Sequence, residues 1–365
     1  MDSLVTANTK FCFDLFQEIG KDDRHKNIFF SPLSLSAALG MVRLGARSDS
    51  AHQIDEVRSL NNESGLVSCY FGQLLSKLDR IKTDYTLSIA NRLYGESSLG
   101  DKSETLSQKK KKKIIYTNAF DTIHTQDILW DLFLGKIKEL FSKDAINAET
   151  VLVLVNAVYF KAKWETYFDH ENTVDAPFCL NQNENKSVKM MTQKGLYRIG
   201  FIEEVKAQIL EMRYTKGKLS MFVLLPSHSK DNLKGITYEK MVAWSSSENM
   251  SEESVVLSFP RFTLEDSYDL NSILQDMGIT DIFDETRADL TGISPSPNLY
   301  LSKIIHKTFV EVDENGTQAA AATGAVVSER SLRSWVEFNA NHPFLFFIRH
   351  NKTQTILFYG RVCSP

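Results

Sequence analysis

The run VLVLVNAVYF, from Val151 to Phe160, restricts the possible folds of this chain more than any other segment. It is rich in β-branched side chains and shows no alternation of apolar and polar residues. A strand with one solvated face would alternate, so this pattern indicates a strand that is buried on both faces. The run is also far shorter than the ~20 residues of a membrane-spanning helix. We therefore expect it in the middle of a covered sheet.

Other segments predict further strands and several helices. Strand patterns occur in KLSMFVLLP from Lys218, SVVLSFPRFTL from Ser254, and the pair HPFLFFI and QTILFYGRV, which the turn-like HNKT joins. Helical spacing of apolar residues occurs near the N-terminus, between Tyr268 and Phe283, and in LSLSAALGMVRLGA, where Ser31-Pro32 is a helix start. No internal repeat or linker divides the chain. We therefore predict an α+β fold with large sheets in one interwoven domain.

Composition and charge exclude several classes of function. The chain has 365 residues, with 42 Lys plus Arg and 46 Asp plus Glu, which gives a formal charge of −4. This balance excludes nucleic-acid binding through overall charge. No G-x-S-x-G, HExxH or glycine-rich phosphate loop is present, and the 8 His show no metal-ligand spacing. We expect neither an enzyme nor a cofactor or metal.

The N-terminus and the cysteines indicate a compartment. The first residues read as an amphipathic helix and not as a cleavable signal, and no segment is long enough to span a membrane. The 4 cysteines are scattered without CxxC pairing, which favours free thiols in a reducing environment. We predict a cytoplasmic protein, with leaderless secretion as the alternative.

Two stretches are unusual for a packed fold. Five consecutive lysines, Lys109 to Lys113, favour a solvated loop, with a weak polyanion-binding patch as the alternative. The second stretch, GTQAAAATGAVVSERSLRS from Gly316 to Ser334, is alanine-rich and uncharged until Glu329. Written as a strand, it carries no charge on either face of its small-residue part, so it could join the middle of a sheet. A flexible linker is the alternative, and composition does not decide between the two.

Four motifs, in a consistent order, resemble those of the serpin family. EVDENGTQAAAATG is similar to the serpin proximal hinge and FNANHPFLFFIR to the C-terminal signature. NIFFSPLSLSAALGMVRLGA resembles the second helix, and VNAVYFKAKWETYF resembles the central strand and the breach, where loop insertion begins. The resemblance covers nearly the whole chain outside 96–134, and it is to the intracellular, ovalbumin-type (clade B) group.

The resemblance implies a fold and a set of site residues. The implied fold is a single serpin domain over 1–365 with three β-sheets, about eight or nine helices and an exposed reactive-centre loop at about 316–335. The hinge would comprise Gly316, Thr317, Gln318, Ala319, Ala320, Ala321, Ala322 and Thr323. The polar shutter under the central sheet and the breach would comprise Ser31, Ser34, Asn156, His306 and Trp164.

It also implies a mechanism. Serpin inhibitors act as suicide substrates, which the protease cleaves before the loop inserts into the central sheet and traps the enzyme covalently. The family's spacing from Gly316 places the cleaved bond at Arg330-Ser331, with Arg333 as a less favoured site. An arginine there suits trypsin-like serine proteases, because its guanidinium pairs with an acid in their specificity pocket. The expected protein is a monomer with a risk of polymerisation by loop addition.

One segment departs from the family pattern. Over 96–134, serpins have a strand and two helices, whereas this chain has the lysine run followed by NAFDTIHTQDILWDLFL. A variant or mis-joined coding segment would explain the departure. In typical serpins, one of these helices covers the central sheet. The alternative to inhibition is therefore that this chain is a non-inhibitory or substrate-only protein with the serpin fold.

Overall fold

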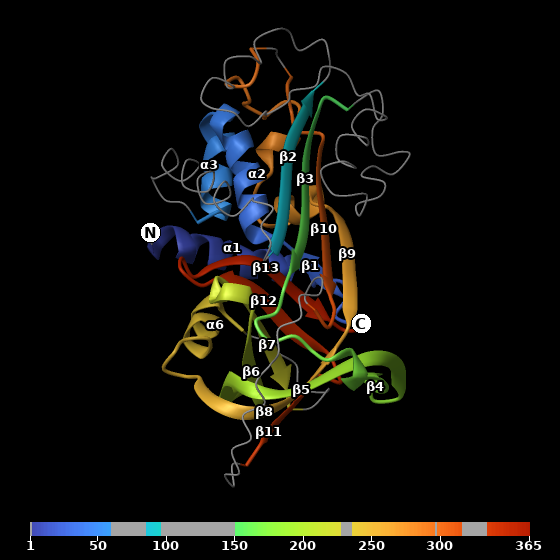
Figure 1. The fold of residues 1–365 in the computed structure, drawn as a ribbon. Coiled ribbons are helices and arrows are strands. Elements are labelled where there is room, and N and C mark those ends of the chain that lie inside the picture. The colour runs from blue at the N-terminus through green and yellow to red at the C-terminus, as the bar shows by residue number, and fades with distance from the viewer. Residues whose placement is uncertain (1, 60–84, 96–149, 228–235, 296–297, 316–333) are drawn as a thin grey trace.

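The structure, a computed structural model, describes residues 2–59, 85–95, 150–227, 236–295, 298–315 and 334–365 (Figure 1). The atypical segment 96–134, and residues 316–333 of the expected loop, lie outside this part of the chain. The count of eight or nine helices also falls partly outside it. In the described ranges the strands form a four-stranded sheet and a nine-stranded sheet.

The four-stranded sheet is built around the apolar run that the sequence singles out. Its strands, in spatial order, are β2 (Tyr85–Gly95), β3 (Leu152–Ala162), β10 (Lys303–Val312) and β9 (Phe262–Asp269). β3 is parallel to β10, whereas β2 and β9 are antiparallel to their neighbours. Almost every residue of β3 is buried, which confirms the predicted central strand.

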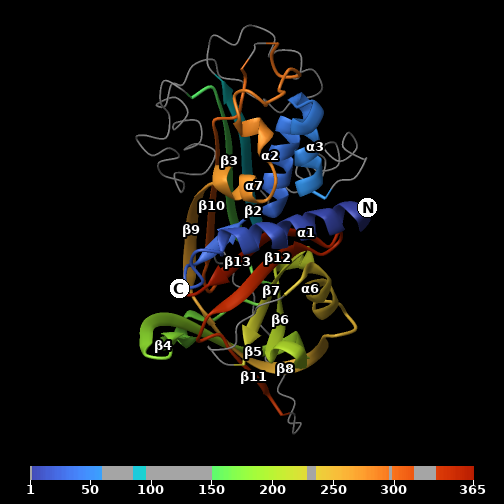
Figure 2. The same ribbon diagram turned by 180° about the vertical axis from the view of Figure 1, so that it is seen from behind.

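Helices lie on one face of this sheet. α2 (Pro32–Gly45) packs directly against β2 and β3, whereas α1 (Asp2–Ile19) and α3 (Ser48–Val57) pack on α2, with α7 (Asn271–Asp276) beside α1 (Figure 2). α2 begins as predicted, because the Ser31 side chain accepts a hydrogen bond from the Ser34 N–H at 3.3 Å and Pro32 occupies the first helical position. The helical prediction between Tyr268 and Phe283 was too long. Tyr268 lies within β9, which ends at Asp269, and a 3-10 helix, η6 (Asp281–Phe283), follows α7.

The nine-stranded sheet lies below the first in Figure 1 and is mostly antiparallel. Its strands are β1 (Ile28–Phe30), β4 (Thr173–Asn181), β5 (Glu184–Ile202), β6 (Ala207–Arg213), β7 (Leu219–Pro226), β8 (Ser251–Pro260), β11 (Val336–Asn339), β12 (Phe344–His350) and β13 (Thr355–Val362). The predicted C-terminal hairpin is present as β12 and β13. The remaining short elements are α6 (Tyr238–Trp244), η3 (His170–Asn172), η4 (Glu203–Val205) and η5 (Thr215–Gly217).

The long strand β5 belongs to two groups of strands. Its first part pairs with β4, its second part pairs with β8, and its end pairs with β6, so the two groups join into one hydrogen-bonded sheet. The three expected sheets therefore occur as two hydrogen-bonded sheets in the described residues.

The strand predicted from Ser254 is divided into β8 and β9, which belong to different sheets. Pro260 ends β8, because proline has no N–H with which to extend the ladder.

Aromatic side chains join the two sheets in the core. The Phe29 ring lies 5.2 Å from that of Phe358, and the Phe358 ring lies 5.1 Å from that of Phe160 on β3. All three side chains are fully buried. Burial of such rings is the main source of core stability, so β1, β3 and β13 hold the sheets together.

Two further expectations concern the surface and the thiols. None of the helices in the described ranges has the length and apolarity for a membrane crossing. Cys12, Cys179 and Cys363 are free thiols, as predicted, and Cys69 lies outside the described residues. Burial raises the pKa of the Cys12 thiol well above its usual value, so this thiol is protonated at neutral pH.

Candidate functional site

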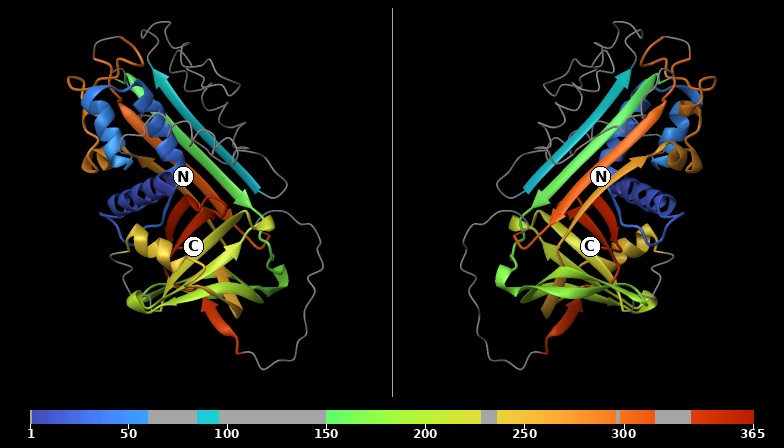
Figure 3. Two further views of the ribbon diagram at one scale, coloured as in Figure 1. Left: turned by 90° about the vertical axis from the view of Figure 1, so that its left-hand side faces the viewer. Right: turned by 90° about the vertical axis from the view of Figure 1, so that its right-hand side faces the viewer.

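The candidate site is the parallel seam between β3 and β10, and Figure 3 shows these two strands side by side within the four-stranded sheet. The two strands are paired from Lys303 opposite Val153 to Val310 opposite Phe160. β10 ends at Val312, and the described chain continues to Asn315, immediately before the expected hinge. The two strands are therefore hydrogen-bonded directly to each other, with no strand between them. The alanine-rich stretch follows in the sequence directly after Asn315, just beyond the end of β10.

A row of polar residues crosses the sheet at the middle of this seam. His306 on β10 lies opposite Asn156 on β3, and the register continues to Asn91 on β2 and to Tyr268 on β9. Asn156 and His306 are fully buried. A buried polar group without a partner costs about 1–3 kcal/mol, so this row is stable only if its members bond to one another.

The row is hydrogen-bonded in one consistent scheme. His306 Nδ1 lies 2.5 Å from Asn156 Oδ1, and the Ser31 N–H donates to His306 Nε2 at 3.1 Å. The Asn156 amide nitrogen donates to Ser34 Oγ and to Asn91 Oδ1. Nε2 must accept, so the neutral imidazole carries its proton on Nδ1. Burial lowers the pKa of His306 to about 3, which keeps the ring neutral at physiological pH.

Ser31 connects this row to a helix and to the other sheet. Its hydroxyl donates to the Leu357 carbonyl of β13 at 2.8 Å while it caps α2. On β10, Thr308 Oγ1 donates to the Phe29 carbonyl of β1 at 2.7 Å. Separation of β3 from β10 would therefore disturb bonds that reach α2, β1 and β13.

Asn91 and Tyr268 are members of the row that sequence reasoning missed. The Tyr268 hydroxyl accepts from the Phe29 N–H at 3.2 Å and donates to Asp266 Oδ2 at 3.0 Å, and burial raises the pKa of both side chains. Asn91 offered a signal, because it interrupts the alternate apolar positions Leu87, Ile89 and Leu93.

Trp164 holds the other end of the seam, next to the expected hinge. Its ring stacks on Tyr214 at 4.4 Å, and its Nε1–H donates to the Asp313 carbonyl at 3.0 Å. The Trp164 N–H also donates to the Asn315 carbonyl at 3.3 Å, and the Phe168 N–H donates to the Glu314 carbonyl at 2.8 Å. Backbone groups of the last described residues before the hinge are thus tied to the Trp164 segment.

Ion pairs reinforce this end. The Glu314 side chain is 3% exposed and lies 3.8 Å from Arg261 and 3.7 Å from His170. Nearby, Lys161 pairs with Glu311 at 3.3 Å. A buried carboxylate needs such partners, so a change at these positions would loosen the chain where it leaves β10.

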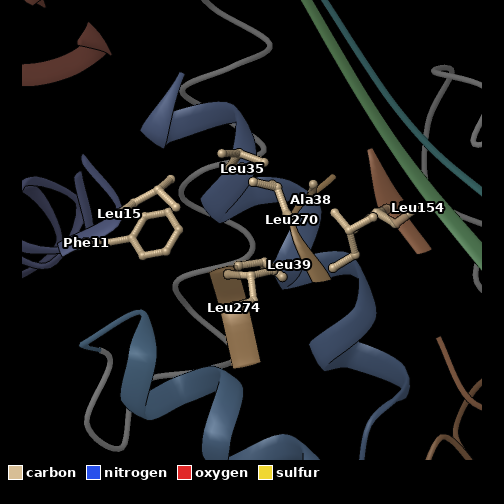
Figure 4. Close-up of a pocket in the computed structure, with 9 residues that line it drawn as sticks. Phe11, Leu15, Leu35, Ala38, Leu39, Leu154, Leu270 and Leu274 are labelled. Atoms are coloured by element: carbon tan, nitrogen blue, oxygen red, sulfur yellow. The ribbon is translucent and has the colours of Figure 1, made fainter. Parts of the chain in front are cut away.

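Apolar side chains pack beneath the seam. They come from helices α1, α2 and α7 and from the sheet, and the space that they enclose is too small for a water molecule (Figure 4). Leu154 and Ile304, which face each other across the β3–β10 pair, form part of this layer. The seam therefore lies on a dry, closely packed apolar layer.

The predicted site residues thus have different outcomes. Ser31, Ser34, Asn156 and His306 lie in one hydrogen-bonded network, and Trp164 lies at the end of the seam. The hinge residues 316–323 and the bond Arg330-Ser331 lie outside the described residues, as does Arg333. In the described part of the chain, no group of His, Cys, Asp and Glu residues could hold a metal ion.

Comparison with known proteins assigns the family. The model of the family described as Serpin (serine protease inhibitor) matches residues 6–365. Serpin B12 of Homo sapiens is 80% identical and Serpin B12 of Mus musculus is 58% identical, each over 100% of both chains. The crystal structure of uncleaved ovalbumin superposes with a TM-score of 0.91 at 33% identity and covers 100% of both chains. The chain therefore belongs to the serpin family, in its ovalbumin-type clade B.

Proposed function

We propose that the chain inhibits trypsin-like serine proteases as a suicide substrate, with cleavage at Arg330-Ser331 followed by insertion of the loop between β3 and β10. The observation that carries this proposal is the parallel pairing of these two strands beside the hinge. A segment that turns back after Asn315 runs opposite to β10. Because β3 is parallel to β10, the same segment runs opposite to β3 as well.

Insertion would improve the pairing of the sheet. The inserted strand converts one parallel pair into two antiparallel pairs, which are slightly more stable per residue. About a dozen newly paired residues at ~1 kcal/mol each supply on the order of 10 kcal/mol. This free energy would be available to drag an esterified protease and distort its active site before water hydrolyses the ester.

The polar row supports a role as the shutter of this process. Insertion must part Asn156 from His306, and their buried hydrogen bond must break and be replaced. Each broken bond costs about 1–3 kcal/mol while it is unpaired, so the row resists spontaneous opening. The Trp164 contacts would act as the breach, because they hold the residues that move first.

The bait residue supports the class of target. Arginine carries a fixed positive charge and a planar fork of donors, which pair with the acid at the base of a trypsin-type pocket. Insertion also requires small hinge side chains, because a charge at Thr317 would become buried without a partner.

Buried free thiols at Cys12 and Cys363 support an intracellular, reducing location, and we propose that the protein acts in the cytoplasm as a monomer. The lysine run 109–113 stays a separate prediction. If it binds polyanions, salt-sensitive retention on heparin would disappear when these lysines are replaced by Gln.

The test is formation of a detergent-stable complex with pancreatic trypsin. We expect the wild type and Thr317→Ser to form the complex, and Thr317→Arg to be cleaved after Arg330 without a complex. Arg330→Ala should abolish both cleavage and complex formation, and a remaining complex would point to Arg333 instead. Equal complex formation by Thr317→Arg and Thr317→Ser would contradict insertion. Cleavage of the wild type without any complex would identify a substrate-only serpin.

A further inference from the structure

We propose that an exposed surface, formed by Leu196 on β5 and Trp335 immediately before β11 and flanked by Lys194, is a second contact for the protease that attacks Arg330. This inference rests on the proposed function and adds to it a determinant of which proteases are captured. Below, these three residues are called the β5–β11 patch.

The patch is apolar and open to solvent. Leu196 is 59% exposed and Trp335 is 48% exposed, although both side chains are large. Lys194 and Leu196 are two positions apart on β5, so they share one face of the sheet. The Lys194 ammonium lies 5.7 Å from the centre of the Trp335 ring, which places the tryptophan over the same face.

Strand register places the patch across three neighbouring strands. Leu196 pairs with Ser254 and Lys194 pairs with Val256, both on β8. Val256 in turn pairs with Glu337 on β11. Ser254 and Val256 therefore lie between Leu196 and Trp335 on this face. Both are smaller and half-buried, so Leu196 and Trp335 project beyond them into solvent.

The position of the patch indicates that its partner is the protease that binds Arg330. Trp335 follows Arg330 by five positions, which span at most about 17 Å of extended chain. A globular domain of ~230 residues has a radius of gyration of about 17 Å. The body of any protease of this size that binds Arg330 would therefore reach the start of β11.

The composition of the patch suits protein recognition. Tryptophan is enriched among the residues that dominate binding energy. The cation–π contact holds the Trp335 ring in place before binding, so less conformational entropy is lost in the complex. The complementary protease surface would be apolar, with a carboxylate near Lys194.

The contact is measurable as affinity for an inactive protease. Pancreatic trypsin in which alanine replaces the nucleophilic serine binds the loop without cleaving it, so its dissociation constant reports docking apart from insertion. We expect Leu196→Ser to weaken this binding about fivefold to tenfold. Val242→Ser is the matched control, because Val242 is 55% exposed and lies on α6, outside the patch.

Leu196 carries the test because it lies outside the reactive loop, whereas a change at Trp335 could alter the loop itself. Lys194→Glu should also weaken binding, and more so at low salt than at high salt. Active trypsin should still form the detergent-stable complex with each variant, at a lower second-order rate.

The outcomes separate this inference from the proposed function. Equal affinities of the wild type, Leu196→Ser and Val242→Ser, with complex formation intact, would overturn the second contact alone. Failure of the wild type both to bind inactive trypsin and to form a complex with active trypsin would overturn the proposed function and this inference with it.

Discussion

The seam of the four-stranded sheet and the group of strands β7, β12 and β13 in the nine-stranded sheet are built in opposite ways. At the seam, β3 and β10 are parallel, and a buried polar row crosses them. In the larger sheet, β7, β12 and β13 are antiparallel, and Phe222 stacks on Phe347 at 4.8 Å. The seam thus combines weaker pairing with a buried hydrogen-bond network, whereas the larger sheet combines stronger pairing with dense aromatic contacts.

The difference teaches that resistance to opening is distributed unevenly. Close-packed aromatic layers resist separation because any movement loses many contacts at once. A few buried hydrogen bonds resist it less, and they can re-form with new partners. The molecule can therefore open one sheet while the other stays intact.

The largest effect in a test of this contrast is expected from a change in the aromatic core around Phe358 on β13. Phe358→Ala removes a fully buried ring that contacts both Phe29 and Phe160, so we expect the free energy of unfolding to fall by about 3–5 kcal/mol. Urea unfolding followed by tryptophan fluorescence measures this loss. Val242→Ser, at an exposed position, should change it by less than ~0.5 kcal/mol. A similarly small loss for Phe358→Ala would refute the idea that this aromatic core resists separation of the strands.

A smaller effect is expected from protonation of the seam. The folded-state pKa of His306 is about 3, below its ordinary value of 6.5, so the unfolded chain binds the additional proton between these values. Stability from this group is complete above about pH 6.5 and decreases as pH falls toward 3, by about 1.4 kcal/mol per pH unit. His306→Gln keeps a donor and an acceptor but does not titrate.

The measurement is the difference in unfolding free energy between the wild type and His306→Gln from pH 7 to pH 4. Carboxylates that titrate in both proteins cancel in this difference. Parallel pH profiles of the two proteins would show that the buried ring does not control the acid sensitivity of the seam.

The smallest expected effect comes from overfilling the apolar layer beneath the seam. Ala38→Val adds two carbons at a fully buried position where no water-sized space exists, so we expect the free energy of unfolding to fall by about 1 kcal/mol. Urea unfolding followed by tryptophan fluorescence measures this loss. A gain in stability would contradict close packing beneath the seam.

Sequence reasoning predicted those elements that depend on local pattern. The apolar run gave β3, Ser31-Pro32 gave the start of α2, and the C-terminal pattern gave β12 and β13. Of the polar row, Ser31, Ser34, Asn156 and His306 were named only through family resemblance.

The missed features depend on contacts between distant segments. Asn91 and Tyr268 join the row only because the register of four strands aligns them, and no single strand contains that information. The division of β8 from β9 and the double pairing of β5 have the same origin. Local periodicity shows which face of a strand is buried, but it does not show which strand lies beside it.

The position of β13 has a consequence for biosynthesis. β13 follows every other described strand in the sequence, yet it lies between β1 and β12 and packs against α1 and α2. At ~5–20 residues per second, a ribosome needs roughly 20–70 s to make 365 residues. Throughout that time the nascent chain exposes the apolar surfaces that β13 will cover, so chaperones would meet it in this unfinished form.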